Sequence, residues 1–359
     1  MKKSSSLKFL MLGLLAVACL VSFRFDNDMP FADEIVQFVS NDDAKEYTTQ
    51  RGDNPTFTEK FTMNGPGFLD VTTSGGGIKV EGSSGNEVEV QVFVRKNGRL
   101  LSNSNSLMEE LQNDYNLKIE KDGDRITAYT KREGNYGWSK KSLSIGFKVY
   151  VPMEMTCDLR TSGGGIKMAK LIGAQQVRTS GGGISMEEIK GAVDASTSGG
   201  GIKVSNQLGN LKLNTSGGRI QVANAKGDVN GRTSGGSIKI EDIDGEVDVR
   251  TSGGSIGLYG MMPSVKASTS GGGIKAEIKG LQKRLDLNTS GGSITATVPG
   301  GMGMDLYLRG NHVNVDLQNF SGTSKKGKVD GSMNGGGLPV NMTTSGGSVN
   351  LYFKGGTAQ

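Results

Sequence analysis

The chain has 359 residues, with 57 glycines, 7 prolines, two cysteines and one histidine, and its formal charge is +5. Glycine at this level without a Gly-X-Y period excludes collagen, and a single histidine excludes a metal site built from several histidines. Without Lys2, Lys3 and Lys8 the 41 basic residues fall to 38 against 36 acidic ones, so composition gives no sign of a nucleic-acid partner.

The N-terminal segment predicts export. Two lysines precede an apolar run over residues 9–21 that is short for a membrane span, so residues 1–23 are interpreted as a signal peptide. Ala16-Val17-Ala18 before Cys19 fits a cleavage site and also a loose lipobox, which makes Cys19 the lipidation candidate. Ordinary cleavage, lipidation and an uncleaved anchor all remain open. The expected location is the cell envelope, either the periplasm or the outer membrane and cell surface.

Residues 24–55 are polar and lack a clear period, so we expect a tether. Residues 56–156 predict a β-rich cap region with one short helix. Alternating apolar residues indicate strands over 88–94 and 143–151, and Asp122-Gly123 indicates a hairpin. Ser106 and Glu109 form a capping box before a helix expected over 107–115. The first copy of a repeated signature, Thr73-Ser-Gly-Gly-Gly-Ile78, also lies in this region.

Residues 157–355 predict a β-solenoid, because the signature Thr-Ser-Gly-Gly-x-Ile recurs with a constant short period up to Thr269 and a slightly longer step to Thr289. A degenerate copy, Met333 to Leu338, precedes a last one at Thr344. Period-2 alternation places the threonines and isoleucines on an inward ladder. Its members are Thr161, Thr179, Thr197, Thr215, Thr233, Thr251, Thr269 and Thr289, with Ile166, Ile184, Ile202, Ile220, Ile238, Ile256, Ile274 and Ile294. The fold class is therefore all-β, a parallel stack of about eleven coils spaced by roughly 4.8 Å.

The first two glycines of each signature do not vary within the chain, so we expect structural turns that need φ > 0 or crowd a neighbouring coil. These are Gly163, Gly164, Gly181, Gly182, Gly199, Gly200, Gly217, Gly218, Gly235, Gly236, Gly253, Gly254, Gly271, Gly272, Gly291 and Gly292. The third position varies between Gly, Ser and Arg. Valine at both Gly235 and Gly253 is expected to damage folding, whereas Gly183→Ser is expected to be tolerated. A further glycine, such as Gly173 or Gly191, marks a second corner in each repeat.

The signature, together with the strand end Val149-Tyr150-Val151-Pro152, resembles an adhesin-like bacterial family of unknown function, DUF4097. The resemblance covers about Phe57 to Phe353. It implies a right-handed β-helix-like fold and an envelope location. Members of that family carry Asp in the third slot, where this chain has Gly, Ser or Arg, so the resemblance assigns no role to an acidic column here.

No catalytic, cofactor or metal site is predicted. The Gly-rich turns lack the Asp of calcium-binding β-rolls and recur in every coil, as structural corners do. The carboxylate pairs Asp242/Asp244 and Glu187/Glu188 each lie at a corner, and Cys157 occupies an inward slot.

The leading interpretation is a non-enzymatic structural or adhesion-type envelope protein that presents polar faces. The alternative is a polysaccharide-binding or -processing β-helix, and a periplasmic stress or signalling accessory also remains open. The partner is unknown, with an envelope or extracellular glycan or protein as candidates. Membrane contact is expected only through the N-terminal lipid or anchor. Self-association stays open because Tyr352 and Phe353 lie near the chain end without an evident cap.

Overall fold

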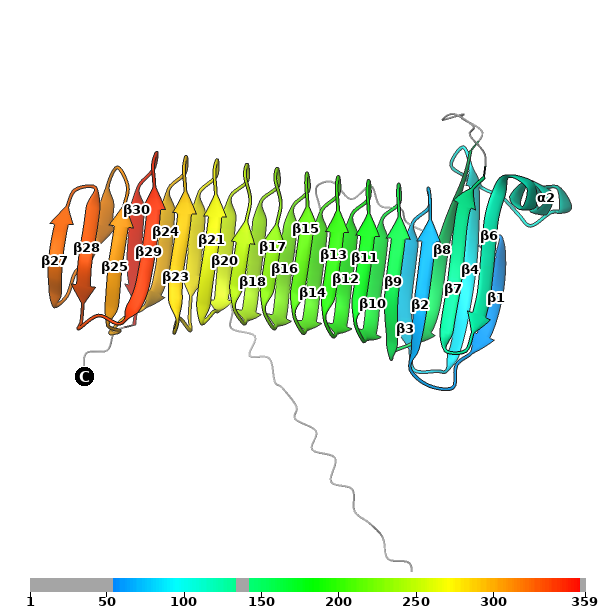
Figure 1. Ribbon diagram of the computed structural model, residues 1–359, viewed down its shortest axis with the longest axis horizontal. Helices are drawn as coiled ribbons and strands as arrows, with labels where there is room; N and C mark the ends of the chain where they lie inside the picture. The colour runs from blue at the N-terminus through cyan, green and yellow to red at the C-terminus, as the bar shows by residue number, and fades with distance from the viewer. Residues whose placement is uncertain (1–53, 134–141, 356–359) are drawn as a thin grey trace, which may run out of the picture. The chain divides into compact units, whose positions relative to one another are not determined.

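A computed structural model describes residues 54–133 and 142–355 (Figure 1). The expected signal peptide with Cys19, and all but the last two residues of the expected tether, lie outside the described residues. All described residues belong to one compact unit, Asp43–Gln359. In this part of the chain no helix is long and apolar enough to cross a membrane.

Two β-sheets of 15 strands each, named here sheet A and sheet B, make up most of the described structure. Sheet A contains β1 (Phe57–Thr62), β3 (Ile78–Ser83), β4 (Glu87–Lys96), β5 (Arg99–Leu100), β8 (Leu143–Pro152), β10 (Ile166–Ile172), β12 (Ile184–Lys190), β14 (Ile202–Leu208), β16 (Ile220–Lys226), β18 (Ile238–Asp244), β20 (Ile256–Met261), β22 (Ile274–Ile278), β24 (Ile294–Pro299), β26 (Val313–Val315) and β30 (Val349–Lys354). Sheet B contains β2 (Gly67–Thr73), β6 (Tyr115–Asp122), β7 (Arg125–Arg132), β9 (Met155–Thr161), β11 (Gln175–Thr179), β13 (Val193–Thr197), β15 (Leu211–Thr215), β17 (Val229–Arg232), β19 (Val247–Arg250), β21 (Ser264–Thr269), β23 (Arg284–Thr289), β25 (Met304–Arg309), β27 (Phe320–Lys325), β28 (Lys328–Met333) and β29 (Leu338–Thr344).

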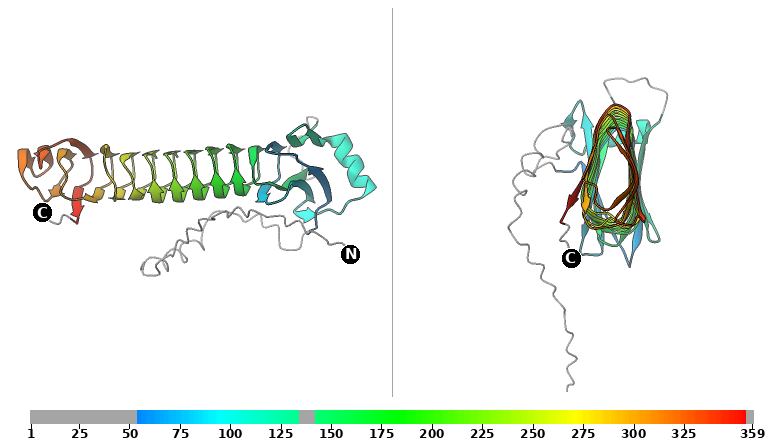
Figure 2. Two further views of the ribbon diagram at one scale, coloured as in Figure 1. Left: turned by 90° about the horizontal axis from the view of Figure 1, so that it is seen from below. Right: turned by 90° about the vertical axis from the view of Figure 1, so that its left-hand side faces the viewer.

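Each sequence repeat forms one coil, which contributes one strand to each sheet. Successive coils pair in parallel, and equivalent residues stack, as Ile166 does on Ile184 and Thr179 on Thr161. Seen along the stacking direction, the coils superimpose (Figure 2). The sequence-based prediction of an all-β, parallel solenoid is therefore confirmed.

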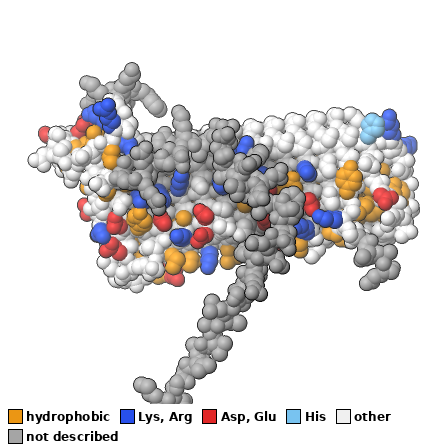
Figure 3. Space-filling view, turned by 180° about the vertical axis from the view of Figure 1, so that it is seen from behind, with side chains coloured by type: hydrophobic (Ala, Val, Ile, Leu, Met, Phe, Trp, Pro, Cys, Tyr) orange, Lys and Arg blue, Asp and Glu red, His pale blue; other side chains and the backbone are white. Residues whose placement is uncertain are grey.

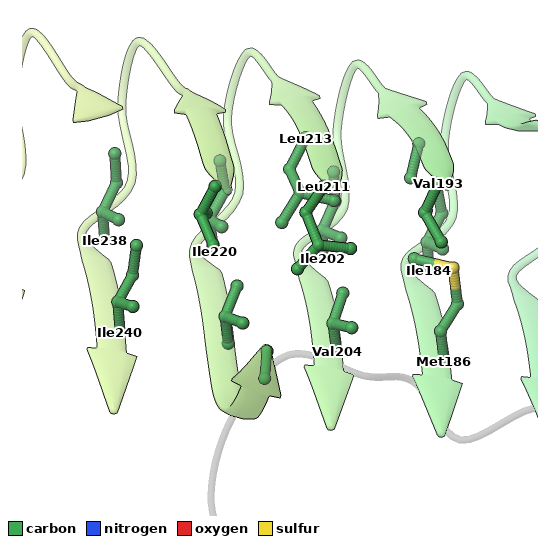
Figure 4. Close-up of a cluster of buried hydrophobic side chains, with 14 of the residues drawn as sticks. Ile184, Met186, Val193, Ile202, Val204, Leu211, Leu213, Ile220, Ile238 and Ile240 are labelled. Atoms are coloured by element: carbon green, nitrogen blue, oxygen red, sulfur yellow. The ribbon is translucent and has the colours of Figure 1, made fainter. Parts of the chain in front are cut away.

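The core lies between the two sheets, because every coil turns one apolar face of each strand inward. In Figure 4, Ile184 and Met186 of sheet A and Val193 of sheet B belong to one such layer, and the next layer repeats it with Ile202, Val204 and Leu211. These side chains are buried. Because a single coil has no second layer to cover its ends, the core depends on stacking.

The N-terminal region contains both a coil and its cap. Strands β2 and β3 carry the first signature and pair directly with β9 and β10, although β4 to β8 lie between them in sequence. The intervening segment folds back so that β7 and β8 extend the stack in parallel, and β6, β4 and β1 then continue the sheets antiparallel.

The helix α2 (Asn105–Asp114) packs beside β6. Its N-cap is Ser104, whose hydroxyl accepts the Leu107 N–H at 3.3 Å, so the expected capping box at Ser106 is wrong. The helix starts two residues earlier than predicted because Ser104 takes the extended backbone that a cap requires.

At the C-terminal end, the order of the coils in the stack differs from their order in the sequence. Strands β29 and β30 insert between the β23/β24 coil and the β25/β26 coil, although the latter precedes them in sequence. The hairpin β27–β28 then covers β25 in antiparallel fashion. The degenerate copy at Met333–Leu338 is not a coil corner: it links β28 to β29 within sheet B. Tyr352 and Phe353 belong to β30, which has β24 on one side and the short β26 on the other.

Candidate functional site

The signature threonines are buried and bind backbone groups of two coils. Thr179 donates its hydroxyl to the Gly164 carbonyl of the preceding coil at 2.8 Å and accepts the N–H of Gly182 at 3.3 Å. The same pair of bonds recurs at Thr161, Thr197, Thr215, Thr233, Thr251, Thr269, Thr289 and Thr344. The period-2 alternation of the sequence predicted that these threonines point inward, but it did not explain why the inward side chain carries a hydroxyl. The reason is that each corner leaves a carbonyl and an N–H that require partners.

The two invariant glycines have different roles. None of the signature glycines has φ in the left-handed region, so that part of the expectation is wrong. Crowding applies to the second glycine: a Cβ on Gly182 would lie 2.1 Å from the Gly164 carbonyl oxygen. A Cβ on the first glycine, Gly181, would lie 3.5 Å from its nearest neighbours, and the third, Gly183, is similar at 3.3 Å. The second glycine therefore sets how closely coils stack.

The opposite corner uses two left-handed positions. Gly173, Gly191, Gly209 and Gly227 have φ of 129–140°, and a Cβ on Gly191 would lie 2.2 Å from the Gly173 carbonyl oxygen. Three residues earlier stands a second left-handed column, with φ of 50–59°, formed by Lys170, Glu188, Asn206, Asn224 and Asp242. This bend turns the following residue inward and creates a core column that strict alternation misses: Leu171, Ile189, Gln207, Ala225 and Ile243. Two asparagines in the bend column could have signalled it, since Asn tolerates this conformation.

A groove of about 480 Å³ follows this corner along the start of the sheet B strands β13 to β23. It crosses six strands, a length of roughly 24 Å at the usual strand spacing. Val193, Leu211, Val229 and Val247 also border it, but their side chains are buried in the core. Polar residues line its sides: Asn210, Lys212, Asp228, Asn230, Glu246, Asp248, Ser264, Lys266 and Arg284. The lining positions repeat in register at the coil spacing, but the side chains differ from coil to coil, as the outward column Lys212, Asn230, Asp248 and Lys266 shows.

Several groups of the groove are already engaged. Asn210 accepts the N–H of Asp228 at 3.0 Å, and Asp228 in turn accepts the N–H of Glu246 at 3.0 Å. Lys212 pairs with Asp194 at 3.0 Å, and Lys283 pairs with Glu246. Acid–base catalysis needs one free carboxylate and one protonated partner at matched positions. Here the Asp228 carboxylate accepts the backbone N–H of Glu246 at the corner, and the Glu246 carboxylate pairs with Lys283.

The chain matches the model of the Toastrack DUF4097 family over residues 68–352. The chain belongs to this family. Two solved structures are similar to it. A "putative adhesin" from Parabacteroides distasonis ATCC 8503 has 15% identity and a TM-score of 0.41, and the match covers 82% of this chain and 96% of that one. A "putative cell adhesion protein" from Clostridium sporogenes ATCC 15579 has 11% identity and a TM-score of 0.17, covering 83% and 99%. No curated protein matches the chain.

The signature corners of this Toastrack protein form a smooth edge of small side chains. Ser162, Ser180 and Ser198 follow the buried threonines and are exposed, as is the glycine directly after each of them. Where grey atoms do not cover it, the upper edge in Figure 3 shows few charged side chains, above a region where charged and hydrophobic side chains are mixed. The edge presents hydroxyls at the coil spacing, and the exposed Arg219 is the one charged side chain within its described signature corners.

Two aspartates that are direct partners in the strand register lie on the outer face of sheet B, on its N-terminal strands β2 and β9. Asp70 of β2 is the direct neighbour of Asp158 of β9. Partial burial, and then the Asp158 carboxylate, raise the pKa of Asp70, against the opposing effect of Arg125 at 3.6 Å. Asp158 itself binds Arg160 through two contacts of 2.6 and 2.9 Å. Arg125 and Arg160 thus each place a positive charge beside one of the two aspartates.

The remaining sequence candidates do not come together in a reactive site. Glu187, Glu188, Asp242 and Asp244 are all partly or fully exposed at the corner. Cys157 is 1% exposed, and burial raises the pKa of its thiol, which suppresses the reactive thiolate. Among the described residues, no three His, Cys, Asp or Glu side chains gather as metal ligands would.

Proposed function

We propose that this Toastrack protein is a non-catalytic, adhesion-type module of the cell envelope that holds an extended polar polymer along the groove of sheet B. The observation that carries this proposal is the continuous row of polar side chains, spaced by one coil, along a groove that crosses six strands. An extended polymer can make a polar contact at each successive coil, so weak contacts add up. The parallel stack fixes their spacing before the ligand arrives, which lowers the entropic cost of binding.

The groove chemistry favours a hydrogen-bonding polymer over an apolar one. Its accessible wall consists of amide, hydroxyl, carboxylate, ammonium and guanidinium groups, while the valines and the leucine that border it are buried. No aromatic ring is among the described residues that line it. A glycan or an extended protein segment bound there would therefore be recognised by its polar groups.

The envelope location is part of the proposal and rests on the N-terminal sequence. Lys2 and Lys3 before the apolar run over residues 9–21 give the pattern of an export signal, and Cys19 within that run is the lipidation candidate. Labelling with a radioactive lipid precursor and fractionating cells would test this. The expected result is a labelled envelope protein whose label is lost in Cys19→Ala; cytoplasmic recovery of the wild type would contradict the location.

The proposal that the groove binds a polymer is tested with an array of polysaccharides and envelope proteins, on which two matched variants are compared. Asn230→Trp adds a bulky side chain at an outward position of the groove, and Gln221→Trp adds the same group on the outer face of sheet A. We expect Asn230→Trp alone to reduce binding. Equal binding by both variants would overturn the groove as the site.

A polysaccharide-processing enzyme is the second candidate, since Asp228 and Glu246 lie together in the groove. Release of reducing ends from any bound polysaccharide, abolished by Asp228→Asn, would favour it. Binding without product release favours the non-catalytic module.

A further inference from the structure

Two arginines lie side by side on the outer face of sheet B. Arg232 ends β17 and Arg250 ends β19, and the two residues are direct partners in the parallel register. Both are exposed, and they stand two residues beyond Asn230 and Asp248, which line the groove on the same strands. Like charges directly opposite each other on neighbouring strands repel, so such a pair requires compensation.

The same chain shows how an arginine pair is compensated internally. Arg160 and Arg178 occupy the equivalent positions on β9 and β11 and are also direct partners. Asp158 binds Arg160 at 2.6 Å, and Gln176 lies between the Asp158 carboxylate and Arg178; with its amide nitrogen turned toward the carboxylate, it makes contacts of 3.1 and 2.9 Å with them. Arg160 thus has an ion-pair partner in Asp158, and Arg178 is connected to the same carboxylate only through the neutral Gln176 amide.

The Arg232/Arg250 pair has only neutral partners. Arg232 donates from Nε to Asn230 Oδ1 at 3.4 Å, and Arg250 donates from Nε to Ser268 Oγ at 2.9 Å. Within residues 54–133 and 142–355, no carboxylate forms an ion pair with either guanidinium, and this includes Asp248, the acidic residue two positions before Arg250. The terminal nitrogens of both arginines are therefore available for an anion that offers two or more oxygens.

The neighbours of this pair suit a carbohydrate. Along the stack, Asn214 is the partner of Arg232, and Ser268 is the partner of Arg250. Ser196 and Asn288 continue the row on either side. Amide and hydroxyl groups on both sides of a cationic centre match a sugar chain whose hydroxyls flank an acidic group.

We propose that Arg232 and Arg250 form an oxyanion site that binds a carboxylate or sulfate carried by a linear polysaccharide. This inference rests on the proposed function, since it names the ligand class of the sheet B face. Both anions offer at least two oxygens to two neighbouring guanidinium groups. The groove then holds the adjoining part of the polymer, and the arginine pair selects for charge.

The test compares two double variants that remove the same charge from the same face. The full chain would carry Arg232→Ala with Arg250→Ala, or Arg160→Ala with Arg178→Ala. Binding to polygalacturonate, dextran sulfate and uncharged dextran would be measured at two salt concentrations. We expect the first variant to bind the preferred charged polymer at least about tenfold more weakly, while the second stays within about twofold of wild type. Preference for polygalacturonate or for dextran sulfate identifies the carboxylate or the sulfate as the anion.

Each alternative outcome has a distinct meaning. Equal losses in the two double variants would overturn the site, because they would indicate only general electrostatic attraction. Equal binding of dextran and both charged polymers by wild type would overturn the anion preference but leave the groove proposal standing. Failure of wild type to bind any of the three polymers would overturn the inference, and the array with Asn230→Trp would then decide the groove separately. Circular dichroism melts of both variants would exclude misfolding as the cause of a loss.

Discussion

The hydroxyl of Thr215 donates a 2.8 Å hydrogen bond to the carbonyl of Gly200, one coil away, and accepts the N–H of Gly218 at 3.2 Å. One side chain thus links two successive corners. Because the bond is buried, its loss leaves backbone groups without water or protein partners. The threonine ladder is for this reason more than a packing feature of the stack.

Thr215→Val tests this link, since valine keeps the shape and removes the hydroxyl. We expect a loss of about 1–2 kcal/mol in the free energy of unfolding, measured by chemical denaturation. Thr215→Ser is the control, because it keeps the hydroxyl and removes a methyl group. If the valine variant were as stable as wild type while the serine variant was destabilised, packing alone would explain the ladder.

Gly235 and Gly236 provide a second matched comparison. A Cβ on Gly236 would lie 1.9 Å from the Gly218 carbonyl oxygen, whereas a Cβ on Gly235 would lie 3.3 Å from that of Gly217. Since the blocking atom belongs to rigid backbone, Gly236→Ala is expected to cost more than about 3 kcal/mol, and Gly235→Ala less than about 1 kcal/mol. Thermal unfolding of the two variants measures the difference. Similar melting temperatures would refute the crowding argument.

The sequence predicted the coil well because its physics is local and repeated. Ile166 and Ile184 stand one repeat apart in identical surroundings, so one coil explains the others. The order of coils at the ends could not be predicted this way, because Thr344 stacks on Thr289 although strands β24 to β28 lie between them in sequence. The intact signature at Thr344, compared with the degenerate one at Met333, was the available signal. The groove was missed because its polar lining resembles an ordinary solvated face.

Cys157 is expected to report on unfolding. Burial raises the pKa of its thiol, so the thiolate that reacts with alkylating reagents is suppressed at neutral pH in the folded coil. We expect iodoacetamide to leave Cys157 unmodified in native protein and to modify it in denaturant, with mass spectrometry as the measurement. Rapid modification under native conditions would show that the first coils open locally.

The hydrogen bonds of Asp305 predict that the turn between β28 and β29 loses stability at low pH. The Ser332 hydroxyl donates to its carboxylate at 2.7 Å and the Gly337 N–H at 3.0 Å, and these bonds lower the pKa of Asp305. A carboxyl group with a lowered folded pKa stabilises the fold fully above its unfolded pKa, and that contribution is lost as the pH falls through the folded value. The protection factors for amide hydrogen exchange of residues 332–338, which correct for the pH dependence of intrinsic exchange, should therefore fall on acidification below about pH 4. Asp305→Asn should show the faster exchange already at neutral pH; unchanged exchange in this variant would contradict the role.

The threaded C-terminus predicts an unusual effect of truncation. Strand β29 pairs with β23 on one side and β25 on the other, and β30 is the parallel partner of β26. Ending the chain at Gly337 should therefore remove protection from amide exchange across residues 304–315, which precede the cut, because β26 loses its strand partner and buried Leu306 and Leu308 lose their cover. A chain ending at Gly355 keeps both strands and serves as the control. In a solenoid whose coils followed sequence order, the same cut would leave residues 304–315 protected, so retained protection there would disprove the insertion of β29 and β30.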